Sequence, residues 1–202
     1  MRGRVYGVAA GSLSDVEAVF GNADTNRIGA AGEQKTALEL GKLAALENGP
    51  TVLHDLRIPG ANANIDHIVV YGRTVMIVDS KVWRNGFYFT LGEKTYRTGD
   101  PGKLFSRFES ADKRTIPFAV RRVEEYLTGL GLRPVMKPGT LVLWPSSQAA
   151  DARKLRTFFY KPAGGVAVSV GASVNNRAAW WRRPADPLIV ASLTRLLISA
   201  GA

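Results

Sequence analysis

Cysteine is absent from this chain of 202 residues. A disulfide framework, a thiolate metal site and a cysteine nucleophile are therefore excluded. Histidine is nearly absent as well, since only His54 and His67 occur, and they offer no His pair to support a zinc site. Ser146-Ser147 lacks the partners of a nucleophilic triad, so hydrolase chemistry of that kind is not expected.

Long apolar runs are also missing. No run approaches the roughly 18 apolar residues of a membrane helix. The first 20 residues lack the apolar stretch and cleavage site of a secretory signal. The absence of cysteine fits a reducing compartment. We therefore expect a soluble, cytoplasmic protein without a membrane partner.

Basic residues are abundant. Lys and Arg number 27 against 17 Asp and Glu, which gives a net charge of +10 and a pI of about 10.1. Such a balance favours a polyanionic partner, and nucleic acid is the commonest one. The basic residues are spread along the chain and form no low-complexity tail, so they would act as a surface field.

The hydrophobic pattern predicts a mixed α/β fold. Hydrophobic residues make up 46% of the chain, enough for one domain with a substantial core. Residues 1–27 are Gly-rich and weakly patterned; we treat them as an N-terminal extension, with a short helix near 14–20, and residues 28–202 as the domain. A helix begins near Gly29 and stops at Asn48-Gly49-Pro50. Further along the chain we expect strands at 51–58, 64–71 and 74–83, a ribbon at 86–100, a helix at 109–131, strands at 139–145 and 165–171, and a helix at 186–201. This order indicates a mixed sheet flanked by helices.

Charged residues interrupt two of these apolar strands. Gly72-Arg73 has the form of a type II′ hairpin turn, which pairs residues whose numbers sum to 145. Asp66 then lies opposite Asp79, with Cβ atoms about 5 Å apart, and Lys81 shares their face. Two carboxylates so placed repel each other, and a divalent cation between them reverses the sign of that interaction. Glu33 lies on the core-facing stripe of the first helix and can approach the same spot.

A blander interpretation stays open at this point. Asp-x-Lys on a strand is more often an exposed surface pair than a site. The register is itself inferred, and a one-residue slip would turn every side chain to the other face.

Three separated motifs resemble those of the nuclease-related domain (NERD) family, a branch of the PD-(D/E)xK nuclease superfamily. They occur in the family's order over residues 29–86: Gly29, Gly32 and Glu33; Ile65, Asp66 and His67; and Asp79, Ser80, Lys81, Trp83 and Gly86. The resemblance implies a restriction-endonuclease-like fold with a mixed central sheet. It also implies that Asp66 and Asp79 hold Mg²⁺ or Mn²⁺, that Glu33 completes the coordination directly or through water, and that Lys81 orients or helps to deprotonate the attacking water. Superfamily nucleases are often dimers, so a homodimer is a further implication.

Other residues have less specific signals. His67 points to the face opposite Asp66, which suits packing or support of the site better than metal binding. Aromatic residues at 87–89 and Trp144 are typical of a core. Related domains often carry a Gln in the helix that corresponds to residues 111–130, and this helix has none. A phosphate contact by Arg121 or Arg122 stays open there, and a solvated helix face is the favoured interpretation. Nucleic-acid contacts are predicted for a basic rim and for the segment 175–184, namely for Lys103, Arg107, Lys113, Arg114, Trp181, Arg182 and Arg183.

Together these features predict a Mg²⁺-dependent nuclease that acts on nucleic acid, DNA above all. The first alternative is a non-enzymatic nucleic-acid-binding protein that keeps the fold and the basic surface. A binding module has no need for carboxylates that repel phosphate, which argues against it. The second alternative is an assembly protein whose charged residues form a buried ion network; such a protein need not show the steep salt dependence of a nucleic-acid binder.

Overall fold

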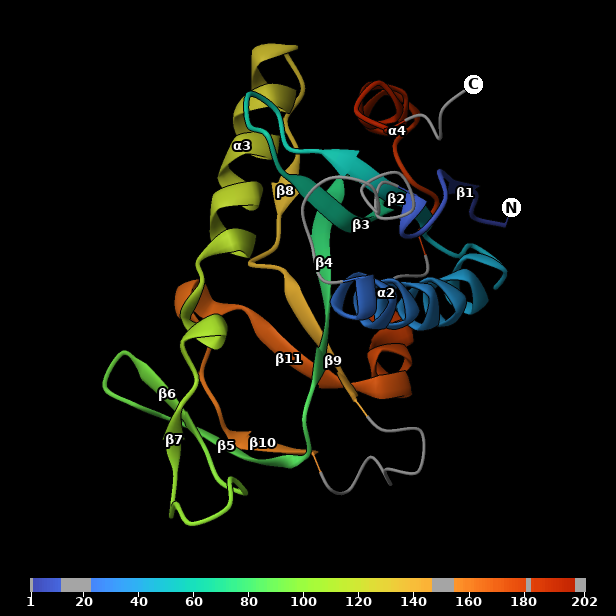
Figure 1. Ribbon diagram of the computed structural model, residues 1–202. Helices are drawn as coiled ribbons and strands as arrows, with labels where there is room; N and C mark the ends of the chain where they lie inside the picture. The colour runs from blue at the N-terminus through green and yellow to red at the C-terminus, as the bar shows by residue number, and fades with distance from the viewer. Residues whose placement is uncertain (1, 12–22, 147–154, 181–182, 199–202) are drawn as a thin grey trace.

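The computed structural model describes residues 2–11, 23–146, 155–180 and 183–198 and has a mixed α/β architecture (Figure 1). Its main sheet has the order β1-β2-β3-β4-β9-β11, with β8 paired to β4. The strands β2, β3 and β4 form an antiparallel meander, and β9 and β11 continue the sheet in parallel. The bounds of the strands are β1 Val5–Tyr6, β2 Thr51–Arg57, β3 Asn64–Tyr71, β4 Thr74–Trp83, β8 Val135–Met136, β9 Thr140–Pro145 and β11 Ala167–Val170.

The β3–β4 hairpin has the predicted register. Its pairs run from Tyr71↔Thr74 to His67↔Val78, and all of them sum to 145. Gly72 in the turn has φ +53°, a backbone conformation that favours glycine. The faces that the sequence assigns to the side chains of these two strands are therefore confirmed.

Helices cover the sheet on both faces. Helix α2 (Ala23–Ala44) packs on one face, where Leu40 and Leu43 join valines of β2, β3, β4 and β9 in a buried cluster. Helices α3 (Thr115–Gly129) and α4 (Pro187–Thr194) cover the other face, and Figure 1 shows α2 and α3 on opposite sides of β4. Because both faces are covered, the central strands read as nearly continuous apolar runs.

A second, smaller sheet adjoins the first. It has the order β10-β5-β6-β7, with bounds β5 Gly86–Leu91, β6 Lys94–Arg97, β7 Ser106–Arg107 and β10 Leu155–Phe159. Only two residues separate the end of β4 from the start of β5, so one nearly continuous stretch of chain links the two sheets (Figure 1). Trp83 at the end of β4 packs against Tyr88 of β5, with ring centroids 4.7 Å apart.

Several predicted boundaries are wrong. Helix α2 begins at Ala23, six residues earlier than expected. Helix α3 begins only at Thr115, because residues 109–112 form a separate 3-10 turn and Lys113 is extended. The strands β1, β7, β8 and β10 were not expected, and the helix expected near residues 14–20 lies outside the described residues. No helix in the described part of the chain is both long and apolar enough to cross a membrane.

Candidate active site

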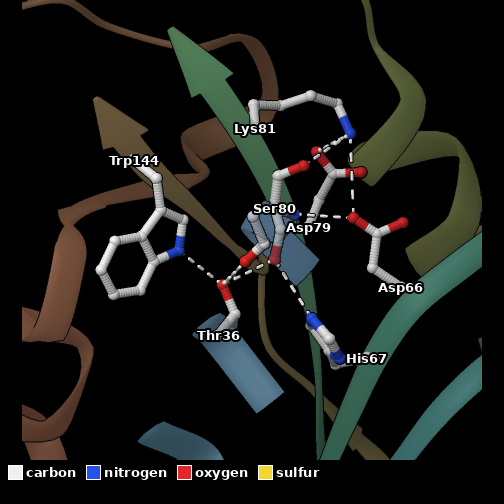
Figure 2. A network of polar contacts seen from close by, with 8 residues as sticks. Thr36, Asp66, His67, Asp79, Ser80, Lys81 and Trp144 are labelled. Atoms are coloured by element: carbon white, nitrogen blue, oxygen red, sulfur yellow. Dashed lines mark hydrogen bonds and ion pairs between the residues drawn. The ribbon is translucent and has the colours of Figure 1, made fainter. Parts of the chain in front are cut away.

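Three charged side chains converge where the regular pairing of β3 and β4 ends (Figure 2). Asp66 and Asp79 come one step beyond the last pair, His67↔Val78. The Lys81 ammonium lies 2.8 Å from Asp79 Oδ2 and 3.8 Å from Asp66 Oδ2. The backbone N–H of Ser80 donates to Asp66 Oδ2 at 2.7 Å. The predicted convergence of these residues on one face of the sheet is therefore confirmed.

The site holds more negative charge than its lysine balances. Burial, followed by the charge of Asp79, raises the pKa of Asp66 to about 7. Burial, followed by the charge of Asp66, raises the pKa of Glu33 to about 8. Burial lowers the pKa of Lys81, but Asp66 and Asp79 outweigh it and raise that pKa well above its usual value. The raised pKa values of Asp66 and Glu33 mean that the ionised forms of these carboxyl groups are disfavoured in the site. A further positive charge would therefore be favourable there.

Glu33 reaches the site because α2 approaches β4 closely. A Cβ atom at Gly32 would lie 2.6 Å from Cγ2 of Val82, so a side chain at this position would push the helix away. Glu33 is the next residue along the helix and is half-buried. The glycine of the first motif thus explains how a helix residue comes close enough to interact with the strand carboxylates.

Asp55 is a fourth carboxylate near the site, and it belongs to none of the three sequence motifs. It is 4% exposed, and the β2–β3 register places it beside Asp66, between the pairs His54↔His67 and Leu56↔Ile65. Its φ is +55°, an uncommon conformation that aspartate tolerates better than most residues. Its charge contributes to the raised pKa values of Asp66 and Glu33. The signal was available in the sequence, since Asp55 also interrupts an apolar strand.

Behind the carboxylates, the opposite face of the sheet carries a buried chain of neutral hydrogen bonds. His67 Nδ1 lies 2.8 Å from His54 Nδ1, and His67 Nε2 lies 3.1 Å from Ser80 Oγ. Ser80 Oγ donates to Thr36 Oγ1 at 2.8 Å, and Trp144 Nε1 donates to the same oxygen at 2.8 Å (Figure 2). As predicted, His67 points to the face opposite Asp66, where it hydrogen-bonds to His54 and Ser80.

The protons of this chain can be assigned from one end to the other. Thr36 donates its only hydroxyl proton to the Gly32 carbonyl at 3.2 Å, so it accepts from Ser80 and Trp144. Ser80 donates its only hydroxyl proton to Thr36, and its oxygen therefore accepts from His67 Nε2–H. His67 Nδ1 is then bare and accepts from His54 Nδ1–H. Burial lowers the pKa of His54 to about 4 and that of His67 well below its usual value, in keeping with two neutral rings.

The predicted nucleic-acid contacts fall in different places. Asp79, Lys81 and Lys113 line one small cavity of about 50 Å³ between β4 and the start of α3. Arg114 is exposed and lies 3.8 Å from Glu93, while Lys103 and Arg107 lie on or beside the small sheet. Arg183 is exposed beside the β3–β4 turn, at the far end of β4 from Lys81, so the structure does not bring it to the site. Trp181 and Arg182 lie outside the described residues.

Two carboxylates offer oxygen ligands of the type that Mg²⁺ prefers. Asp66 and Asp79 are 13% and 14% exposed, and both already face one cationic group, the Lys81 ammonium. Within the described ranges, no three His, Asp or Glu side chains are grouped closely enough to form a metal site by themselves. The pair therefore fits a cation whose remaining ligands are water and phosphate oxygens, the usual arrangement for Mg²⁺.

Comparison with known proteins agrees with the motifs. Residues 28–126 match the family model described as the nuclease-related domain. No curated protein and no solved structure matches the chain. The matched segment begins in α2, ends in α3 and includes Glu33, Asp66, Asp79 and Lys81. The resemblance drawn from three short motifs is confirmed over this segment of the chain.

Proposed function

We propose that the protein is a metal-dependent nuclease of the PD-(D/E)xK type that hydrolyses phosphodiester bonds of DNA. The observation that carries the proposal is the pair of mostly buried carboxylates on neighbouring strands, bridged by Lys81 within the segment that matches the nuclease-related domain. A nucleic-acid-binding module without catalytic activity gains nothing from such a pair, because carboxylates repel phosphate. The net charge of +10 supplies the attraction for the polyanion.

Asp66 and Asp79 would hold Mg²⁺ or Mn²⁺, and Glu33 would complete the set directly or through water. When bound, such a cation lowers the pKa of a water ligand and offsets the charge that develops on phosphate oxygens. Ser80 fixes Asp66 through its backbone N–H, so this carboxylate is oriented before any ligand arrives. Asp79 has an ion pair with the Lys81 ammonium at 2.8 Å.

Lys81 suits the binding and orientation of the scissile phosphate. Its side chain is 50% exposed, so the ammonium can turn from the carboxylates toward a ligand in the adjoining cavity. Its raised pKa keeps it protonated at neutral pH. It would therefore supply positive charge and hydrogen bonds to phosphate and water, and would not remove a proton from the attacking water.

The test is cleavage of supercoiled plasmid and of labelled single strands with Mg²⁺, Mn²⁺ or EDTA. We expect metal-dependent cutting by the wild type and a loss of at least about a hundredfold in Lys81→Ala, since removal of one group that stabilises the transition state typically costs this much. Lys42→Ala is the matched control. Lys42 is 59% exposed and pairs at 2.6 Å with the mostly buried Glu39, as Lys81 pairs with Asp79, but it lies in the last turn of α2.

Equal activity of Lys81→Ala and Lys42→Ala would refute the role of Lys81. Salt-sensitive binding of DNA without cleavage in either metal would refute nuclease activity. The alternative of a non-enzymatic nucleic-acid-binding protein would then remain. Absence of both binding and cutting would favour the assembly protein, in which the ion pairs are structural.

A further inference from the structure

The small sheet has two unlike faces. On the inner face Tyr88 is fully buried and contacts Trp83 and Phe108, with ring centroids 4.7 and 5.2 Å away. Side chains alternate along β5, so its neighbours Phe87 and Phe89 belong to the outer face. The sequence favours a core position for all three aromatic residues, which is correct for Tyr88 only.

Five aromatic rings form a continuous row across the outer face. Successive ring centroids lie 5.9, 5.8, 5.6 and 5.4 Å apart along the series Phe159, Phe87, Phe89, Tyr96 and Phe105. The three central rings are nearly parallel, with interplanar angles of 26° and 22°. The rings at the two ends are open to solvent: Phe159 is 57% and Phe105 is 49% exposed. We call this row the aromatic row.

Cations border the aromatic row. The Arg107 guanidinium lies 5.8 Å from the centre of the Tyr96 ring. Arg156 pairs in register with Phe87, and Lys94 pairs with Leu91, so both lie on the outer face. All three cations are exposed, and the nearby Glu93 is engaged by Arg114 at 3.8 Å. An exposed apolar surface bordered by positive charge is suited to a negatively charged partner that carries flat apolar groups.

Single-stranded nucleic acid is such a partner. Its bases are unpaired and stack on aromatic side chains, while its phosphates are attracted to Lys and Arg. A second copy of this chain fits less well, because in a two-fold interface the same patch meets itself and its excess positive charge would be self-repelling. Double-stranded DNA keeps its bases stacked on one another and offers phosphates but no free base faces.

The aromatic row is also connected to the candidate active site. Phe87 comes six positions after Lys81 along nearly continuous strand, a distance of at most about 20 Å when extended. We propose that the outer face of the small sheet is a stacking platform for unpaired bases, and that the protein therefore prefers single-stranded DNA or the single-stranded part of a branched substrate. This inference rests on the proposed function and specifies its substrate class.

The experiment measures binding in EDTA, so that no strand is cut. Fluorescence anisotropy compares a labelled oligothymidylate, an abasic strand of the same length and a blunt duplex. The variants are Phe159→Leu and Phe105→Leu, which keep apolar volume but remove an exposed ring at either end of the aromatic row. The matched control is Phe118→Leu on α3, where an exposed ring also lies 5.8 Å from an arginine, Arg121, but has no ring neighbours among the described residues.

We expect each variant in the row to weaken oligothymidylate binding by about tenfold, the loss of about one stacked base. The wild type should bind the abasic strand at least as weakly as the variants bind oligothymidylate. On the abasic strand the variants should bind like the wild type. Phe118→Leu should bind like the wild type. If Phe159→Leu proves unstable on heating, Phe105→Leu carries the comparison alone, because it removes a ring from the opposite end.

Equal affinity of the wild type for the thymidylate and abasic strands would overturn the platform. So would a dimer in sedimentation that is lost in Phe159→Leu while strand binding is unchanged, since the face would then be an interface between copies. The two proposals can fail separately. Ring-dependent binding without metal-dependent cutting would refute only the nuclease, and cutting with ring-independent binding would refute only the platform.

Discussion

The two faces of strands β3 and β4 hold polar groups of opposite kinds, although the residues concerned are immediate neighbours in sequence. Asp66, Asp79 and Lys81 face α3, whereas His67 and Ser80 face α2. The face toward α3 carries charged groups, and the pKa values of Asp66 and of the nearby Glu33 are raised. The face toward α2 carries neutral groups whose polar protons all take part in hydrogen bonds. One face is electrostatically unsatisfied and opens to a cavity; the other is closed and satisfied.

The two faces also respond to pH in opposite directions. Asp66 and Glu33 have raised pKa values, so the folded state holds protons that the unfolded chain releases, and these groups cost stability as pH rises from about 4 to 8. His54 has a lowered pKa, so between pH 6.5 and 4 the unfolded chain binds a proton at this residue and the folded chain does not. Stability is therefore lost as pH falls from 6.5 toward 4. The difference teaches that buried polar groups can have two effects: groups with all their hydrogen bonds made hold the strands together, and unbalanced carboxylates leave a position that favours a further positive charge.

The largest expected effect is on activity, from the unsatisfied face. Asp66→Asn should reduce cleavage by at least about a hundredfold, because a metal-bound carboxylate contributes several kcal/mol to transition-state stabilisation. Its melting temperature at pH 8 should be unchanged or higher, since the substitution removes a disfavoured charge and leaves an oxygen for the Ser80 N–H. Cleavage rates and thermal unfolding are measured together. A folded variant with wild-type activity would contradict the assignment of the site.

A smaller effect, on stability, is expected from the satisfied face. Thr36→Val removes the oxygen that accepts from Ser80 and Trp144, and the Ser80 hydroxyl is buried. One buried donor left without a partner costs about 1–3 kcal/mol, or roughly 2–10 °C in melting temperature for a chain of this size. Cleavage well below the melting temperature should change by less than about tenfold, because no reacting group is removed.

Thr140→Val is the control for this substitution. Thr140 is also buried, but its hydroxyl has only a weak contact of 3.6 Å with the sulfur of Met76, so the melting temperature should fall by clearly less. Equal losses in the two variants would mean that the hydrogen-bonded chain adds no stability beyond packing.

The smallest effect concerns the metal itself. Mg²⁺ should raise the melting temperature by a few degrees at pH 8.5, by about 1 kcal/mol of linked binding, and by less at pH 5.5. Protons compete with the cation for Asp66 and Glu33, whose pKa values are about 7 and 8. Thermal unfolding with Mg²⁺ and with EDTA at both pH values gives the four melting temperatures. A shift that is the same at both pH values, or that persists in Asp66→Asn, would place the cation elsewhere.

Local patterns in the sequence are sufficient to predict which residues lie on which face of strands β3 and β4. The turn Gly72-Arg73 fixed the β3–β4 register, and strand alternation then placed Asp66 and His67 on opposite faces. Pairings between distant segments were not predictable in this way. Strand β10 joins β5 across more than 60 residues, and short strands such as β1 have too few positions for a period to appear. The left-handed backbone of Asp55 and the position of Arg183 likewise depend on tertiary contacts that no local pattern encodes.

The order of the strands along the chain has a consequence for how the molecule folds. The strands β2, β3 and β4 follow one another through short connections, whereas β9 joins β4 only after residues 84–139 have been bridged. Closing short loops costs less entropy than closing long ones, so we expect the meander to form before β9 docks. The acidic residues of β3 and β4 would then meet in the folding transition state, where a cation that relieves their repulsion would speed folding and change the unfolding rate little.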